Sequence, residues 1–174
     1  IYDRQDAQPW LELGADGVVI GILKPDGTIN MEQMAELVNA AKGIGITMHR
    51  AFDVCSNPYE ALEQCVSLGI DTILTSGQRS CAWEGRELLS ELVRRADGRI
   101  DILAGAGIGP EVIRELADYT GVRSFHMSGK KVLDSRMEFR RSGVPMGIPG
   151  FSEFEIWQTD ADQVRRAVEI LKER

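Results

Sequence analysis

The sequence IGITMHRAFD at residues 44–53 begins with a short run of apolar and β-branched residues and ends in polar ones. Such a run, with little alternation, predicts a strand that is buried on both faces, as in parallel sheets. A helix is expected next, because Asn57 is a favoured capping residue, Pro58 suits the first helical position and Gly69 ends the helical pattern. The segment therefore predicts a strand–helix unit with polar side chains at the carboxyl end of the strand.

The same unit recurs along the chain. Strands that alternate with helices pair in parallel through right-handed crossovers, and both a doubly wound sheet and a (β/α)8 barrel fit that pattern. A long irregular segment, rich in glycine and proline, precedes a last helix at about residues 160–172. The strands are expected at residues 17–23, 44–48, 72–75, 100–104 and 122–127.

The spacing of these strands separates the two architectures. At this spacing eight units need about 200 residues or slightly more, and the 174 residues hold five. Trp10, Leu11 and Leu13, ahead of Gly14, resemble the tail of an earlier helix. We therefore expect an α/β, TIM-barrel-like (β/α)8 fold that is incomplete here, with a single barrel domain over residues 1–174 that lacks the first units.

The composition argues against two classes of partner. The net charge is −7 and the basic residues are scattered, whereas nucleic-acid binding needs clustered lysine and arginine. The mean hydropathy is −0.17, and no stretch approaches the roughly 20 apolar residues of a membrane-spanning helix. We expect neither a nucleic-acid partner nor a membrane partner.

The cysteines give no disulfide framework and no metal motif. Cys55, Cys65 and Cys81 are odd in number and irregularly spaced, which favours reduced thiols in the cytoplasm. The sequence has no HxxxH, HxH or CxxC pattern. Cys55 and the pair His126–Met127 offer the soft donors that cuprous copper prefers, but Cys65 lies on an apolar helix stripe. No metal ligand is assigned from the residues alone.

Polar residues and glycines gather where the predicted strands end. In parallel α/β folds, ligands bind outside the carboxyl ends of the strands, so we expect these residues to line one shared mouth. The candidate catalytic residues are His49, Asp53 and His126, and the candidate ligand-binding residues are Arg50, Ser76, Gly77, Gly105, Gly107 and Ser128.

Each candidate has a chemical interpretation and a structural one. As an enzyme, the mouth would hold a phosphate or carboxylate with Arg50 and the glycine turn 105–107, and one of His49 and His126 would exchange a proton. Asp53 would then orient His49 or Arg50. Equally, Arg50 and Asp53 could form an ion pair that ties down their loop, and the glycines could serve a tight strand-to-helix turn. That turn is not G-x-G-x-x-G, so a dinucleotide site is not expected.

Several motifs together resemble the CutC copper homeostasis family. They are GADGVVIG at residues 14–21, HRAFD at 49–53, ILTSG at 73–77, AGAGI at 104–108, FHMS at 125–128 and DSRMEFR at 134–140. The resemblance implies a cytoplasmic, homo-oligomeric TIM-barrel-like protein of copper homeostasis, with copper as its bound ion. It lacks the N-terminal portion of the family, to which the cysteines proposed for copper belong, so no copper ligand carries over.

Two functions remain open from the sequence. The family resemblance favours a protein that binds or traffics copper. The residues at the strand ends favour an enzyme that acts on a small anionic metabolite bearing a phosphate or a carboxylate.

Overall fold

A computed structural model describes residues 14–41, 43–144, 146–147 and 152–173, which group into two compact units, 1–127 and 128–174. The first unit holds β1 (Gly17–Ile20), α2 (Met31–Ala40), β2 (Gly45–Met48), the 3₁₀ helix η2 (Arg50–Val54), α3 (Pro58–Leu68), β3 (Thr72–Thr75), α4 (Arg86–Ala96), β4 (Asp101–Ala104), α5 (Pro110–Thr120) and β5 (Ser124–Phe125). The second holds β6 (Lys130–Asp134), β7 (Glu155–Thr159) and α6 (Ala161–Lys172).

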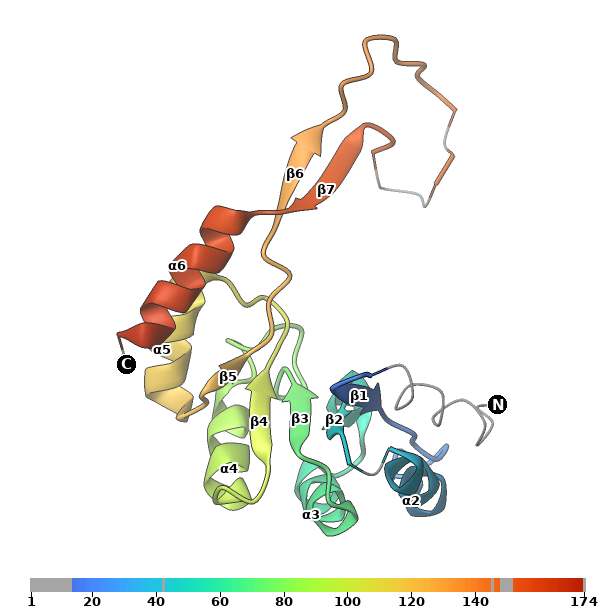
Figure 1. The fold of residues 1–174 in the computed structure, drawn as a ribbon, viewed down its shortest axis with the longest axis vertical. Coiled ribbons are helices and arrows are strands. Elements are labelled where there is room, and N and C mark those ends of the chain that lie inside the picture. The colour runs from blue at the N-terminus through green and yellow to red at the C-terminus, as the bar shows by residue number, and fades with distance from the viewer. Residues whose placement is uncertain (1–13, 42, 145, 148–151, 174) are drawn as a thin grey trace. The chain divides into compact units, whose positions relative to one another are not determined.

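The first unit is built on one parallel sheet whose strands follow the order β1-β2-β3-β4-β5 (Figure 1). A doubly wound sheet reverses its strand order at a switch point, and this sheet does not. Because every crossover runs to the next strand in the same direction, right-handed connections place all the helices on one face. This is the winding of a barrel, so the TIM-barrel-like prediction is confirmed.

The core lies between the sheet and its helices. Alternate strand residues are buried, and those on the opposite face are partly exposed, with Val19 at 63%. The apolar runs in the sequence predicted that both faces of the sheet are buried. Within the described residues, helices cover only one of these faces. The buried strand residues are Ile46, Met48, Ile73, Thr75, Ile102 and Ala104.

Local sequence signals explain the helix ends. The Asn57 side chain accepts hydrogen bonds from the amides of Tyr59 and Glu60 at 3.1 and 3.3 Å, and Pro58 opens α3. Gly69 closes the helix with a φ of +75°, in the left-handed region that glycine adopts without strain. The capping residues expected for this helix are therefore confirmed.

The second unit contains two strands that the sequence did not predict. Residues 130–134 and 155–159 were expected to be irregular, but they pair as an antiparallel hairpin. All ten strand residues are exposed, so the hairpin carries no buried apolar face that a periodic pattern could reveal. The first strand is also shorter than expected and ends at Ile20, and the fifth covers residues 124–125 only.

Two expectations stay predictions. The expected helix tail at Trp10, Leu11 and Leu13 lies outside the described residues. The single domain over residues 1–174 is likewise untested.

The loop after β3 packs backbone to backbone against the start of α4. A Cβ on Gly85 would lie 1.9 Å from the Ser76 carbonyl oxygen, whereas a Cβ on Gly45 would meet its nearest atom at 3.5 Å. We expect Gly85→Ala to lower the free energy of unfolding by about 2–3 kcal/mol and Gly45→Ala by about 0.5 kcal/mol or less. Urea unfolding of the two variants measures this, and equal losses would contradict the close packing.

Candidate functional site

The Asp53 carboxylate is the centre of a hydrogen-bond cluster at the carboxyl ends of β2 and β3. Its side chain is 7% exposed and accepts from the Thr75 hydroxyl at 2.5 Å, the Ser76 amide at 3.0 Å and the Gln78 amide at 3.2 Å. Arg50 Nε donates to its other oxygen at 2.6 Å. We call Arg50, Asp53, Thr75, Ser76 and Gln78 the Asp53 cluster.

The hydroxyl groups of β3 extend the cluster into the following loop. Thr75 Oγ1 donates to Asp53 and accepts from the Gly77 amide at 2.9 Å. Ser76 Oγ accepts from Arg50 Nη2 at 2.8 Å. It also lies 3.0 Å from Asp53 Oδ2 and 2.6 Å from the Arg79 carbonyl oxygen, and it can donate to only one of them at a time. The cluster therefore fixes the backbone that leads from β3 towards α4.

The cluster keeps Asp53 ionised. Burial alone would raise the pKa of Asp53, but hydrogen bonds from Thr75, Arg50 and the amides of Ser76 and Gln78 lower it below its ordinary value. At neutral pH the carboxylate is thus an acceptor only. Asp53 is therefore not a proton donor there, and it holds its neighbours by accepting their hydrogen bonds.

Arg50 is fixed in place and still reaches solvent. Its side chain is 45% exposed, although Nε donates to Asp53 and Nη2 donates to Ser76. The sequence left open whether Asp53 would orient His49 or Arg50, and the hydrogen bond goes to Arg50. The ion pair between Arg50 and Asp53, which the sequence offered as the structural interpretation, is present. The remaining nitrogen of Arg50, Nη1, makes no hydrogen bond to any described residue.

His49 caps the 3₁₀ helix that carries Asp53. Its Nδ1 accepts from the Ala51 amide at 3.0 Å, and a Cβ on Gly21 would lie 2.6 Å from its Cε1, so the ring rests on the backbone at the end of β1. Because Nδ1 accepts, the neutral imidazole carries its proton on Nε2. His49 is therefore placed to donate from Nε2.

The glycine turn after β4 is closely packed. A Cβ on Gly105 would lie 2.6 Å from Leu74 Cδ1, and one on Gly107, whose φ is +69°, would lie 2.9 Å from Cys81 Cβ. The Glu111 carboxylate lies over the start of α5. A Cβ added to Gly109 would lie only 2.2 Å from Glu111 Oε1. Close packing thus accounts for these glycines, and the nearby carboxylate makes the turn less attractive to an anion.

His126 and Ser128 are not members of the Asp53 cluster. His126 is exposed at the end of β5, at the same end of the sheet as His49, but β3 and β4 lie between their strands. Three strand spacings along the sheet amount to about 14 Å. Ser128 is exposed and belongs to the second unit. The catalytic and ligand-binding roles of all these residues stay predictions.

A groove borders the Asp53 cluster on the side of α4. Its volume is about 320 Å³. Two carboxylates, Glu84 and Glu87, stand beside Arg79 in its wall, so its charge is mixed rather than basic. The lining residues are Gly77, Gln78, Arg79, Glu84, Gly85, Glu87 and Leu88.

Two members of the cluster were missed from the sequence. Thr75 could have been found, because it directly precedes Ser76 at the end of an expected strand. Gln78 gave no signal: its φ is +57°, and its side chain donates to the Cys55 carbonyl oxygen at 2.9 Å. A positive φ at a glutamine is not readable from residue type.

The described part of the chain shows no metal cluster and no membrane span. No group of three histidine, cysteine or acidic side chains is close enough to hold an ion there. None of the helices described is both long and apolar enough to cross a bilayer.

Replacing Asp53 tests the role of the cluster. We expect Asp53→Asn to lower the free energy of unfolding at neutral pH by about 3 kcal/mol, because an amide cannot satisfy this many donors. Since the folded-state pKa of Asp53 is lowered, its contribution is present above about pH 4 and is lost as the pH falls below that value. Urea unfolding at pH 7 and pH 3.5 measures both effects.

Asp26→Asn is the matched control. Hydrogen bonds from Thr28 lower the pKa of Asp26 as well, but this carboxylate is fully exposed. Its replacement should change both stability and pH dependence much less. Equal effects of the two substitutions would contradict a special role of the Asp53 cluster.

Comparisons with known proteins place the chain in a family. A model of the CutC family matches residues 3–131. A family protein CutC of Parabacteroides distasonis is 48% identical over 155 residues, which cover 88% of this chain and 64% of that protein. One of Bacteroides thetaiotaomicron is 40% identical over 169 residues, covering 97% and 68%. This chain thus spans about two thirds of the length of the curated relatives it matches.

Solved structures agree with that placement. A crystal structure of CutC from Streptococcus agalactiae, named for copper homeostasis, has a TM-score of 0.68 and 30% identity, and the match covers 72% of this chain and 65% of that one. A structure described as native KDPGal has a TM-score of 0.60 over 99% of this chain and 66% of that one, and at 13% identity it shows the fold alone. With its family model, its relatives and its fold in agreement, the chain belongs to the CutC family.

Proposed function

We propose that this chain serves in copper homeostasis, the role named for the Streptococcus agalactiae relative, and that its own part is to bind a small anion at the ends of β2 and β3. The observation that carries the second statement is Arg50. Its guanidinium is held on two sides by Asp53 and Ser76 and is half-exposed on the remaining side. A fixed guanidinium with a free edge is suited to a carboxylate or a phosphate.

The anion is proposed at Arg50 rather than at the glycine turn. The carboxylate of Glu111 stands at the start of α5 beside that turn, whereas the charge of Asp53 is already satisfied by Arg50 and its other donors. Gly105 and Gly107 then serve mainly to let the neighbouring loops approach. Ser76 and Gly77 hold the arginine and its loop in place.

The catalytic part of the proposal rests on His49. It directly precedes Arg50 and can donate a proton from Nε2, while its Nδ1 is occupied by the Ala51 amide. Asp53 acts as a positioning residue through Arg50. His126 lies three strand positions away and would serve a different part of a larger ligand.

Cys55 and Cys65 do not fit a resident copper ion. Burial is the main cause that raises the pKa of the Cys55 thiol, and it raises the pKa of Cys65 to about 12, so both stay protonated at neutral pH, whereas the thiolate is the metal ligand. Cys55 Sγ also accepts from Gln78 Nε2 at 3.4 Å. The bound copper that the family resemblance implies stays untested, and these two thiols argue against it in this chain. Free, buried thiols support the proposed cytoplasmic location, because such thiols suit a reducing compartment.

Phosphate binding tests the anion site. Titration of the chain with inorganic phosphate, followed by the backbone amide signals of residues 49–53 and 75–78, should show saturable binding. Arg50→Gln should weaken it at least about tenfold, and Arg50→Lys should also weaken it, because lysine lacks the planar fork.

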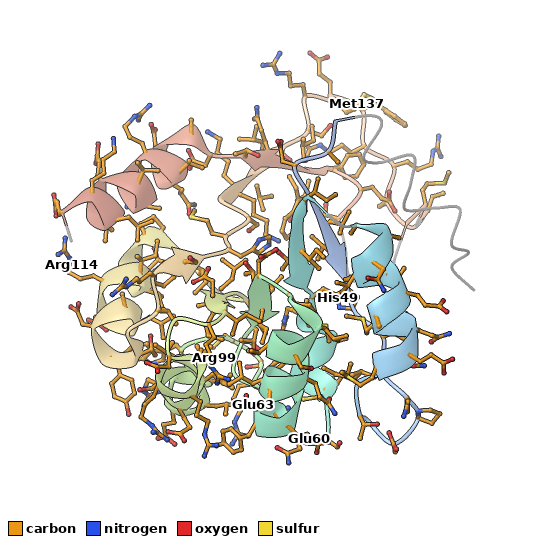
Figure 2. The ribbon with its side chains drawn as sticks, turned by 60° about the horizontal axis from the view of Figure 1, so that its bottom comes forward. His49, Glu60, Glu63, Arg99, Arg114 and Met137 are labelled. Carbon is orange, nitrogen blue, oxygen red and sulfur yellow. The ribbon has the colours of Figure 1, made fainter. Side chains whose placement is uncertain are left out.

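Arg99→Gln is the control for charge alone. Arg99 and Glu63 form a two-bond ion pair at 2.7 Å, and Figure 2 shows the two labelled side chains close together. Removing this charge should leave phosphate binding unchanged. Equal weakening by Arg50→Gln and Arg99→Gln, or saturable binding that survives Arg50→Gln, would contradict the assignment.

Cuprous ion tests the copper prediction. We expect the 174-residue chain, titrated under reducing conditions with a competing chromophoric chelator, to bind cuprous ion more weakly than micromolar, with Cys55→Ser and His126→Ala unchanged. The reason is that both thiols near α3 are buried and protonated. Stoichiometric, tighter binding that either substitution abolishes would instead place a copper site in this chain.

A further inference from the structure

The groove beside the start of α4 holds charged side chains that do not neutralise one another. Arg79, Glu84 and Glu87 are exposed and stand in its wall. In the part of the chain that the structure describes, the side chains of Arg79 and Glu87 make no ion pair and no hydrogen bond. Glu84 accepts one hydrogen bond, from the Ser80 hydroxyl. Charged groups of both signs in this wall therefore remain available to a ligand.

The arginine next to Glu87 in the sequence is engaged elsewhere. Arg86 donates from Nη1 to the Trp83 carbonyl oxygen at 2.8 Å. Its guanidinium also lies 4.8 Å from the centre of the Trp83 ring and 5.5 Å from that of Tyr119. These contacts direct Arg86 away from Glu87, which keeps its charge on the first turn of α4.

The backbone that carries the wall of the groove is held in place. The Arg79 carbonyl oxygen lies 2.6 Å from Ser76 Oγ, which also accepts a hydrogen bond from Arg50 at 2.8 Å. A Cβ on Gly77 would lie 2.3 Å from the Gly85 carbonyl oxygen, so two backbone segments touch where the loop after β3 meets α4. The groove is therefore largely preformed, and binding does not have to order its backbone first.

The volume and the charge of the groove limit the class of ligand. Its volume of about 320 Å³ is at the lower end of the range for pockets that hold small molecules. Its ionisable lining has one positive group, on Arg79, and two negative groups, on Glu84 and Glu87. A ligand that matches this set carries one carboxylate and two cationic groups, which is the charge set of a free basic amino acid.

We propose that this groove binds a free basic amino acid such as lysine. The planar guanidinium of Arg79 holds the carboxylate of the ligand, and Glu84 and Glu87 hold its two cationic groups. Leu88, half-buried in the same wall, offers an apolar contact for the aliphatic chain of the ligand. The proposal does not rest on the proposed function, because Arg50 is not among the residues that line the groove.

Two simpler ligands match the lining less well. A small anion would meet Arg79 but also two carboxylates in the same wall. A metal ion would be repelled by Arg79, and the described residues contain no group of three histidine, cysteine or acidic side chains that could hold one. A ligand with charges of both signs uses the whole lining.

Titration with L-lysine tests the site. In a phosphate-free buffer at pH 7 and constant chloride, the backbone amide signals of residues 77–79 and 84–88 of the 174-residue chain should shift saturably, with a dissociation constant of about 1 mM. Nα-acetyllysine lacks the α-ammonium group and cadaverine lacks the carboxylate. Each should bind about fivefold more weakly than L-lysine, because each loses one charged contact.

Substitutions in the groove test which residues bind. Arg79→Gln and Glu87→Gln should each weaken L-lysine binding about fivefold, and Arg79→Gln should bind L-lysine and cadaverine equally, because its carboxylate contact is gone. Arg123→Gln and Glu115→Gln are the matched controls, because both side chains are exposed and lie outside the lining of this groove. Both controls should leave the binding unchanged. Circular dichroism checks that each variant is folded.

The possible results either support or overturn the proposal. The absence of a saturable shift up to about 20 mM L-lysine overturns it. Cadaverine or Nα-acetyllysine that binds as tightly as L-lysine also overturns it, because one set of charges in the groove then contributes nothing. Weakening by both groove variants and by neither control, with equal binding of L-lysine and cadaverine to Arg79→Gln, supports it. Any other pattern among the four variants overturns it.

Discussion

The Asp53 carboxylate joins the carboxyl ends of β2 and β3 by accepting hydrogen bonds from Thr75 and Ser76. It is supplied by a 3₁₀ helix after β2 and collects donors from the end of β3, so the two loops are held as one piece. Burial of a carboxylate is costly unless its oxygens are saturated, and here several donors saturate them. The position of Arg50, the capping role of His49 and the path of the β3 loop all depend on this arrangement.

The barrel-type winding was predictable because its signals are local and repeated. Asn57, Pro58 and Gly69 mark the ends of α3 through capping and turn geometry, and those effects act within a few residues. The position of the polar residues at strand ends was predictable for the same reason. The hydrogen-bond partner of each polar residue was not predictable. Asp53 could have oriented His49 or Arg50, and the choice depends on the 3₁₀ helix at residues 50–54, for which the sequence carries no periodic signal.

The two histidines show how strand order limits a site. Both follow the carboxyl ends of parallel strands, which places them at one end of the sheet. The same order puts β3 and β4 between the strands that the two histidines follow. Strand order therefore brings the predicted residues to one edge of the sheet, and the roles of His49 and His126 towards a ligand stay predictions.

The hairpin of the second unit escaped prediction because none of its strand residues is buried. Strand periodicity is visible when one face is buried, and the ten residues of β6 and β7 have no buried face in the chain that carries them. The charged residues of β6 instead make contacts within the unit, Asp134 with Arg140 and Lys130 with the Trp157 ring. An isolated pair of strands is at best marginally stable in water, and Val132 and Trp157 remain half-exposed on this one, so no alternation of buried and exposed residues could mark the hairpin in the sequence.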